Sequence, residues 1–143
     1  MLTAGGSMAE GKAKVVRPGE AQPQPVARTR GAFMAVLLGP EQGVPNFVTR
    51  RFILEPGGRI PAHRHDTIEH QQVVLRGEMV LGLDGKEHVV RAGDAVFIPA
   101  GCAHWYENRT GEVVEFLCVV PKTATYATEW LEEPPPGAFL PGG

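Results

Sequence analysis

Three of the chain's five histidines lie within eight residues of one another. They are His63, His65 and His70, in the segment PAHRHDTIEH, while His88 and His104 follow further along the chain. Side chains two residues apart on a strand share one face, so His63 and His65 are expected to point the same way. Imidazole is a good ligand for divalent transition metals. The cluster therefore predicts a metal site rather than three unrelated structural histidines.

A second segment with the same kind of chemistry lies downstream. It reads GDAVFIPAGCAHWYEN, covers residues 93–108 and contributes His104. The two segments follow the patterns G-x5-H-x-H-x4-H-x6-G, from Gly57 to Gly77, and G-x5-P-x-G-x2-H-x3-N, which ends at Asn108. They resemble the two signature motifs of the cupin family, the second at every fixed position and the first at all but one. The resemblance extends over roughly residues 45–121.

Resemblance to cupins implies an all-β fold, an antiparallel jelly-roll β-barrel of two facing sheets. It also implies a metal held by inward histidines of both motifs, here His63, His65, His70 and His104. Four neutral imidazoles would leave the full charge of a divalent ion in place, which attracts anionic oxygen ligands. Iron, manganese, copper, nickel, cobalt and zinc all accept imidazole, and the sequence does not choose among these divalent transition metals.

The one departure from the family pattern concerns the third ligand of the first motif, which is usually Glu. Counting forward from His65 reaches Glu69, whereas counting back seven residues from Gly77 reaches His70. Neighbouring residues on a regular strand face opposite ways, so both cannot easily reach one metal. Gly77 sets the register of a hairpin, while the loop after His65 can absorb an extra residue. We therefore predict His70 as the ligand and Glu69 as a solvated carboxylate.

Strand and turn signals favour the all-β class independently of the resemblance. Gly (18) and Pro (13) make up 31 of the 143 residues, which disfavours a helical bundle and favours short strands with tight turns. The segment 73–83 is expected as one strand with apolar odd positions, and Glu55-Pro56-Gly57-Gly58 is expected to end the strand before it. The expected strands are 31–38, 47–54, 73–83, 86–90, 95–98 and 112–120. Such regular spacing is typical of a sandwich or barrel.

The chain divides into three parts on composition. Residues 1–30 are expected as a flexible, extended arm, of which residues 1–7 are interpreted as an expression scar before a natural start at Met8. Residues 31–121 are the predicted cupin barrel, and residues 122–143 a Pro-rich tail with a short helical turn around residues 128–133.

Charge and cysteine content narrow the classes of partner and compartment. Fourteen Lys and Arg against sixteen Asp and Glu give a net charge of −2, with no basic stripe for nucleic acid. No apolar run is long enough for a membrane span. Two cysteines and no secretory signal favour the cytoplasm. Resemblance to small cupins implies a homodimer, for which residues 13–40 offer strand-forming sequence that can pair with a neighbour's sheet edge.

Side-chain alternation selects the residues expected near the metal. If His70 and His104 face inward, Gln72 and Tyr106 should do so too, and they are our catalytic candidates: Gln72 to bind a ligand water and Tyr106 to donate to the substrate. His88 lies outside both motifs and is predicted to be structural. Asn108 is predicted to tie a loop backbone.

Three functions remain open at this point. The first is a metal-dependent oxygenase acting on a small organic chelator such as a diketone, enol or phenol, because a six-coordinate ion with four His ligands keeps two open positions. The second is a non-redox isomerase, lyase or decarboxylase of a small sugar acid or carboxylate. That reaction needs a base, and no inward carboxylate is evident, which slightly favours the oxygenase. The third is a module that binds a metal or metabolite without turnover.

Overall fold

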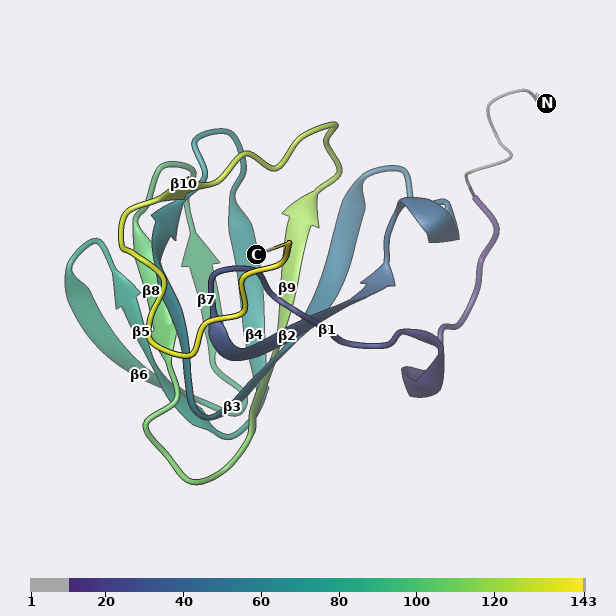
Figure 1. The fold of residues 1–143 in the computed structure, drawn as a ribbon. Coiled ribbons are helices and arrows are strands. Elements are labelled where there is room, and N and C mark those ends of the chain that lie inside the picture. Colours follow the sequence, from purple (N-terminus) through teal and green to yellow (C-terminus); the bar gives the residue numbers. More distant parts are fainter. Residues whose placement is uncertain (1–10, 143) are drawn as a thin grey trace.

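The computed structural model describes residues 11–142, and almost all of its regular structure is strand (Figure 1). Residues 1–10, which include the expected scar and Met8, lie outside this range. The strands are β1 Gln24–Pro25, β2 Arg30–Leu38, β3 Phe47–Arg64, β4 His70–Arg76, β5 Glu78–Leu83, β6 Lys86–Arg91, β7 Ala95–Ile98, β8 His104–Glu107, β9 Val114–Pro121 and β10 Glu129–Trp130. Two short 3-10 turns, η2 Pro18–Glu20 and η3 Pro40–Gln42, are the helical elements of the described residues. No helix among these residues is long and apolar enough to cross a membrane.

The strands form one curled antiparallel sheet in the order β6-β5-β8-β3-β9-β4-β7, with β2 and β10 also paired to β3. On one side of β3 the sheet continues through β8, β5 and β6, and on the other side through β9, β4 and β7. These two arms face each other and enclose the core (Figure 1). The predicted all-β, antiparallel jelly-roll barrel is confirmed.

The long strand β3 joins the two arms of the barrel. Its first half, up to Leu54, pairs with β9, and its second half, from Arg59, pairs with β8. The expectation that Glu55–Gly58 ends the strand is wrong, because these residues bend β3 from one arm to the other. Gly57 takes a φ of +79°, and a Cβ on Gly58 would lie 2.8 Å from the Glu55 carbonyl oxygen. Glycine therefore lets the strand turn without ending.

The segment 73–83, expected as one strand, is two strands separated by Gly77. The φ of Gly77 is +82°, and a Cβ there would lie 2.6 Å from the Val113 carbonyl oxygen. Buried and exposed residues alternate along most of β4, whereas the four central residues of β5 are all buried. The side chains of Val73 and Leu75 on β4 are 41% and 46% exposed, so the expected apolar odd face holds only after Gly77.

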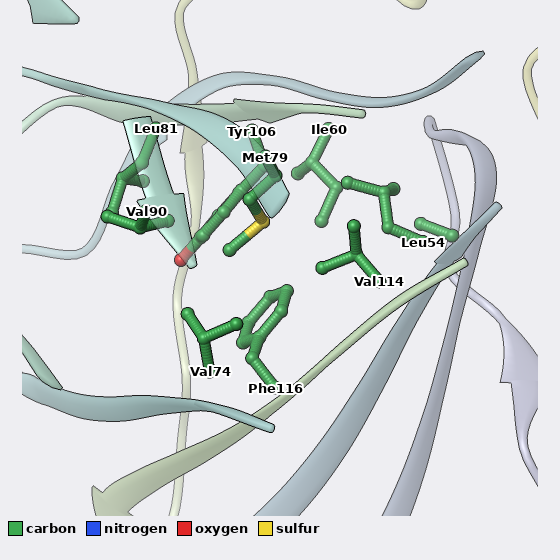
Figure 2. Packing of buried hydrophobic residues seen from close by; sticks show 10 residues of the cluster. Leu54, Ile60, Val74, Met79, Leu81, Val90, Tyr106, Val114 and Phe116 are labelled. Carbon is green, nitrogen blue, oxygen red and sulfur yellow. The ribbon is translucent and has the colours of Figure 1, made fainter. Parts of the chain in front are cut away.

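The hydrophobic core fills the barrel beneath the histidines. Figure 2 shows side chains from facing strands meeting at its centre, with the ring of Phe116 beside Val74. Phe116 also stacks between two other rings, those of Phe52 and Tyr106, each with its centroid 5.1 Å away. The buried cluster comprises Ala32, Leu54, Ile60, Val74, Met79, Leu81, Val90, Tyr106, Val114 and Phe116. This apolar floor fixes the inner faces of the strands that carry the site.

The C-terminal segment, residues 122–142, runs along the barrel (yellow in Figure 1). The helical turn expected around residues 128–133 is wrong, because Glu129 and Trp130 form β10 and pair with the end of β3. Further on, the amide of Phe139 donates to the Thr29 carbonyl and its own carbonyl accepts from Arg28. Unpaired backbone groups of the barrel thus give this segment the hydrogen bonds that a helix would have made internally.

Candidate metal centre

Three histidines come together at one end of the barrel. His63 on β3 is the register partner of His104 on β8, and His65 follows directly after β3. One ring nitrogen from each lies within 4.8 Å of the other two, a spacing suited to a single metal ion. The ring centroids of His63 and His104 are 4.2 Å apart. The bend in β3 and the β3–β8 pairing therefore unite two sequence segments that lie about forty residues apart.

His70 lines the same cavity from the opposite arm. It begins β4, is 3% exposed, and has its ring centroid 5.0 Å from that of His65 and 5.4 Å from that of His104. Its Nδ1 atom is buried without a hydrogen-bond partner among the described residues. The neighbouring Glu69 is exposed and lies outside this cavity. His70 is not among the three close nitrogens, yet an orphaned buried nitrogen beside them is what an added ligand or ion would satisfy.

Backbone carbonyls orient three of the rings. The Nδ1 atoms of His63, His104 and His65 lie 2.8, 2.9 and 3.1 Å from the carbonyl oxygens of Pro61, Cys102 and Ala127. A carbonyl only accepts a hydrogen bond, so each Nδ1 carries the proton and each Nε2 keeps a free lone pair. Histidines that bind metals are commonly fixed in this way. The three rings therefore each leave Nε2 available to a metal.

Electrostatics keep the imidazoles neutral. Burial, with the charge of His104 as the second cause, lowers the pKa of His63 and of His70 to about 3. Burial also lowers the pKa of His104 to about 4 and reduces that of His65. Metal binding requires the neutral form, so no proton has to be displaced near pH 7.

Gln72 and Tyr106 lie inside the barrel next to this centre. The Nε2 atom of Gln72 donates to the Tyr106 hydroxyl at 2.7 Å, and the Tyr106 ring meets His104 edge-on with centroids 5.7 Å apart. Burial strongly raises the pKa of Tyr106, so the phenol stays protonated. It is suited to donate a hydrogen bond, not to act as a base. The Oε1 atom of Gln72 is buried without a partner among the described residues.

Other residues singled out in the sequence lie away from the cavity. His88 is exposed on β6. Asn108 is fully buried, and its side-chain amide donates to the carbonyls of Leu54 and Glu112 while its oxygen accepts from the Thr110 amide. Its predicted role in tying a loop backbone is confirmed.

Three residues that border the cavity were not selected as site residues from the sequence. Arg50 projects into it from β3, and Thr128 and Trp130 border it from the C-terminal segment. Arg50 could have been found from alternation, because Val48 and Leu54 on the same strand are clearly apolar and share its parity. Thr128 and Trp130 gave no such signal, since their position depends on how the segment folds back.

The cavity has a volume of about 150 Å³. That is below the range of roughly 300–1,000 Å³ typical of drug-sized ligands, so it suits a smaller molecule. Its polar lining consists of the four histidines, Arg50, Gln72, Tyr106 and Thr128. Over residues 11–142 no Asp or Glu lines it. The donor set is therefore nitrogen-rich and free of carboxylates, which fits a transition metal rather than Mg²⁺ or Ca²⁺.

Comparison with known proteins shows similarity across the barrel. Residues 50–120 match the family model described as "Cupin domain". The chain is 34% identical over 119 residues to a curated protein named oxalate-binding protein from Thermotoga maritima, covering 79% of this chain and 98% of that one.

Solved structures give the same result. The polyketide cyclase RemF from Streptomyces resistomycificus superimposes with a TM-score of 0.78 at 28% identity, over 85% of this chain and 87% of that one. A cupin-superfamily sugar phosphate isomerase from Silicibacter pomeroyi gives a TM-score of 0.64 at 30% identity, over 71% and 66% of the two chains. Motifs, barrel and relatives agree that this chain belongs to the cupin family.

Proposed function

We propose that this protein is a metal-dependent enzyme acting on a small organic substrate that chelates through oxygen. This proposal rests mainly on the four imidazoles that line one cavity, in which the described residues place no carboxylate. Three of the imidazoles are oriented by hydrogen bonds through Nδ1. His63, His65 and His104 would hold the ion, with His70 as the fourth ligand. A divalent ion here supplies Lewis acidity and, if redox-active, electron transfer.

The catalytic roles proposed for Tyr106 and Gln72 follow from their hydrogen bond. Gln72 donates to the Tyr106 oxygen, so the phenol's own proton is free to point to a substrate oxygen in the cavity. Tyr106 would then stabilise negative charge that develops on that oxygen. Gln72 would hold the phenol in place and offer its unpaired Oε1 to a water or a substrate hydroxyl.

Oxygenase chemistry is the reaction that the geometry supports best. Over the described residues, the cavity offers no carboxylate and its phenol is neutral, so a reaction that depends on a side-chain base lacks one. Oxidation at a redox metal leaves the difficult chemistry to the ion and asks the chain mainly to position the substrate.

A non-redox reaction is the second candidate, and the relatives favour it. The solved structures at 28% and 30% identity are named as a polyketide cyclase and a sugar phosphate isomerase. On this alternative the ion and Tyr106 would polarise a carbonyl of a small sugar acid or carboxylate. A binding module without turnover is the reading favoured by the curated relative's name, oxalate-binding protein.

Turnover with and without oxygen separates these possibilities. Protein made without an affinity tag would be analysed for bound elements, then loaded anaerobically with iron, manganese, copper, nickel, cobalt or zinc. Each form would be given diketones, enols, phenols and small sugar acids. Stoichiometric oxygen uptake supports the oxygenase, and anaerobic conversion supports the non-redox enzyme. Binding without conversion across the panel would contradict both and leave the binding module.

We further propose a cytoplasmic homodimer. Both cysteines are free thiols, as a reducing compartment requires. Large apolar side chains are exposed on adjacent strands of one arm, notably Val73, Leu75 and Phe97, and a second copy could cover them. The expected pairing through residues 13–40 would use the edge of β2, which β1 covers over two residues only. Light scattering on the purified protein measures the mass directly, and a monomer at micromolar concentration would contradict the proposal.

A further inference from the structure

Arg50 lies on the inner face of the sheet, in one row across the strands with Cys118 and Gln72. It is the register partner of Cys118 on β9, which in turn is the partner of Gln72 on β4. Arg50 lines the same cavity as the four histidines. The next residue, Arg51, points to the opposite face of β3 and forms an ion pair of 2.8 Å with Glu115.

The guanidinium of Arg50 has no carboxylate partner within residues 11–142. Its one hydrogen-bond acceptor there is the Cys118 sulfur at 3.1 Å, which is a weak acceptor, and its Nε atom is buried without a partner. By contrast, Arg30 also lacks a carboxylate but donates to the carbonyls of Gly57 and Pro136. A half-buried cation with so few acceptors is costly unless an anion completes it.

The cavity around Arg50 favours an anion with a particular shape. Four neutral imidazoles leave a bound divalent ion with its full charge, and Arg50 adds another positive charge in the same carboxylate-free space. Guanidinium presents two parallel N–H donors that match a carboxylate. The stacking of Arg50 on the Phe52 ring, 5.2 Å from its centroid, limits the directions in which that fork can point.

We propose that Arg50 binds the carboxylate of the substrate while a second oxygen of the same molecule reaches the histidine centre. This assignment rests on the proposed function and narrows it. The substrate class becomes a small carboxylic acid with a neighbouring keto, hydroxyl or carboxylate oxygen. Arg50 is then a residue that determines specificity, since a neutral chelator of the same size leaves its charge unpaired.

Titration calorimetry on cobalt-loaded protein tests the assignment, with oxalate as the anionic probe and imidazole as the neutral one. Arg50→Gln should lose about tenfold to hundredfold in oxalate affinity, as expected for a charge-assisted hydrogen bond, and keep its metal content and its imidazole affinity. Arg51→Gln is the matched control, because it removes the neighbouring guanidinium from the opposite face, and it should bind both probes as the wild type does. The visible spectrum of cobalt reports independently whether the coordination is unchanged.

A second variant, Arg50→Lys, distinguishes loss of the Arg50 contact from misfolding of Arg50→Gln. It keeps the charge but loses the two-point fork, so its oxalate affinity should fall between those of the wild type and Arg50→Gln. Equal oxalate affinity in the wild type and the Arg50 variants would overturn the assignment and leave the metal centre standing. So would a wild type that binds imidazole but not oxalate, or a variant that loses both probes alike. A wild-type protein that holds no metal would instead overturn the proposed function.

Discussion

The barrel and the C-terminal segment orient the histidines in different ways. His63 and His104 are held by carbonyls two residues earlier in the chain, Pro61 and Cys102. His65 is held by Ala127, which lies 62 residues away in the C-terminal segment. The barrel thus orients two of the proposed ligands through local contacts, whereas the orientation of the third depends on how the C-terminal segment docks.

The same segment also closes the cavity. The ring centroid of Trp130 lies 5.0 Å from that of His63, and the guanidinium of Arg28 lies over the Trp130 ring at 5.1 Å from its centroid. Glu132 anchors the segment by accepting from the Ala62 amide at 2.8 Å and from Arg59. A region that resembles a tail in sequence therefore borders the proposed metal centre, and its effect should be separable from that of the barrel.

The largest effect is expected from the ligands that the barrel fixes. His63→Ala and His104→Ala should each weaken metal binding by about hundredfold, because each removes one of four ligands that share roughly 10 kcal/mol or more. His88→Ala should leave it unchanged, since His88 is exposed outside the cavity. Elemental analysis and competition with a chromogenic chelator measure this. Equal metal affinity in all three variants would reject the site.

Removing the C-terminal segment tests whether that segment orients His65 for metal binding. Deleting residues 126–143 should lower metal affinity by about tenfold to hundredfold, the usual effect of losing a hydrogen bond that orients a ligand. If the loss acts through His65, the same deletion in a His65→Ala background should cost much less. Chelator competition on the four proteins completes this cycle. Additive losses would show that the segment acts on the barrel as a whole and not through His65.

A smaller effect on metal affinity is expected at the start of β4, where it decides whether His70 or Glu69 is the ligand. His70→Ala should weaken metal binding by about tenfold or more, as expected for a fourth ligand in a neutral site. Glu69→Ala should change nothing, because that carboxylate is exposed. The same competition assay decides between them. A loss confined to Glu69→Ala would mean that the strand shifts by one residue when metal binds.

Much of the barrel was predictable because alternation on short strands is a local property. His70, Gln72 and Tyr106 could be placed in the interior from parity alone, and the structure buries all three. Alternation failed where glycine changes the backbone direction. Gly57 and Gly58 bend β3 instead of ending it, and Gly77 divides the expected strand 73–83 in two. The motif spacing shows where a glycine lies, but it does not show whether the strand ends, bends or divides there.

The remaining parts of the site depend on contacts between distant segments. Arg50 precedes the first histidine motif. Alternation along its strand indicates an inward position, but its place beside Cys118 and Gln72 follows only from the pairing of β3 with β9 and of β9 with β4. Trp130 follows the last strong strand and looks like a packing residue of a tail. Its position was not encoded in periodicity, because it depends on β10 adding to the end of β3.

A different kind of effect is expected on the stability of the metal-free protein as pH changes. The lowered pKa values of His63, His70 and His104 mean that the unfolded chain binds more protons than the folded one below about pH 6.5. Stability should therefore be fully present above that pH and fall as the pH decreases towards about 3. Each histidine contributes at most about 1.4 kcal/mol per pH unit.

Urea unfolding of chelator-treated protein at pH 7 and pH 5 measures this dependence. His63→Gln should flatten it, because a neutral amide replaces a group that must stay uncharged when buried. His88→Ala should leave it unaltered, since His88 is exposed and takes no part in the buried cluster. Equal stability at the two pH values would mean that the rings are hydrated in the metal-free protein. The cavity would then be formed by the ion rather than by the barrel, and the contrast between barrel-held and segment-held ligands would apply to the metal-loaded protein alone.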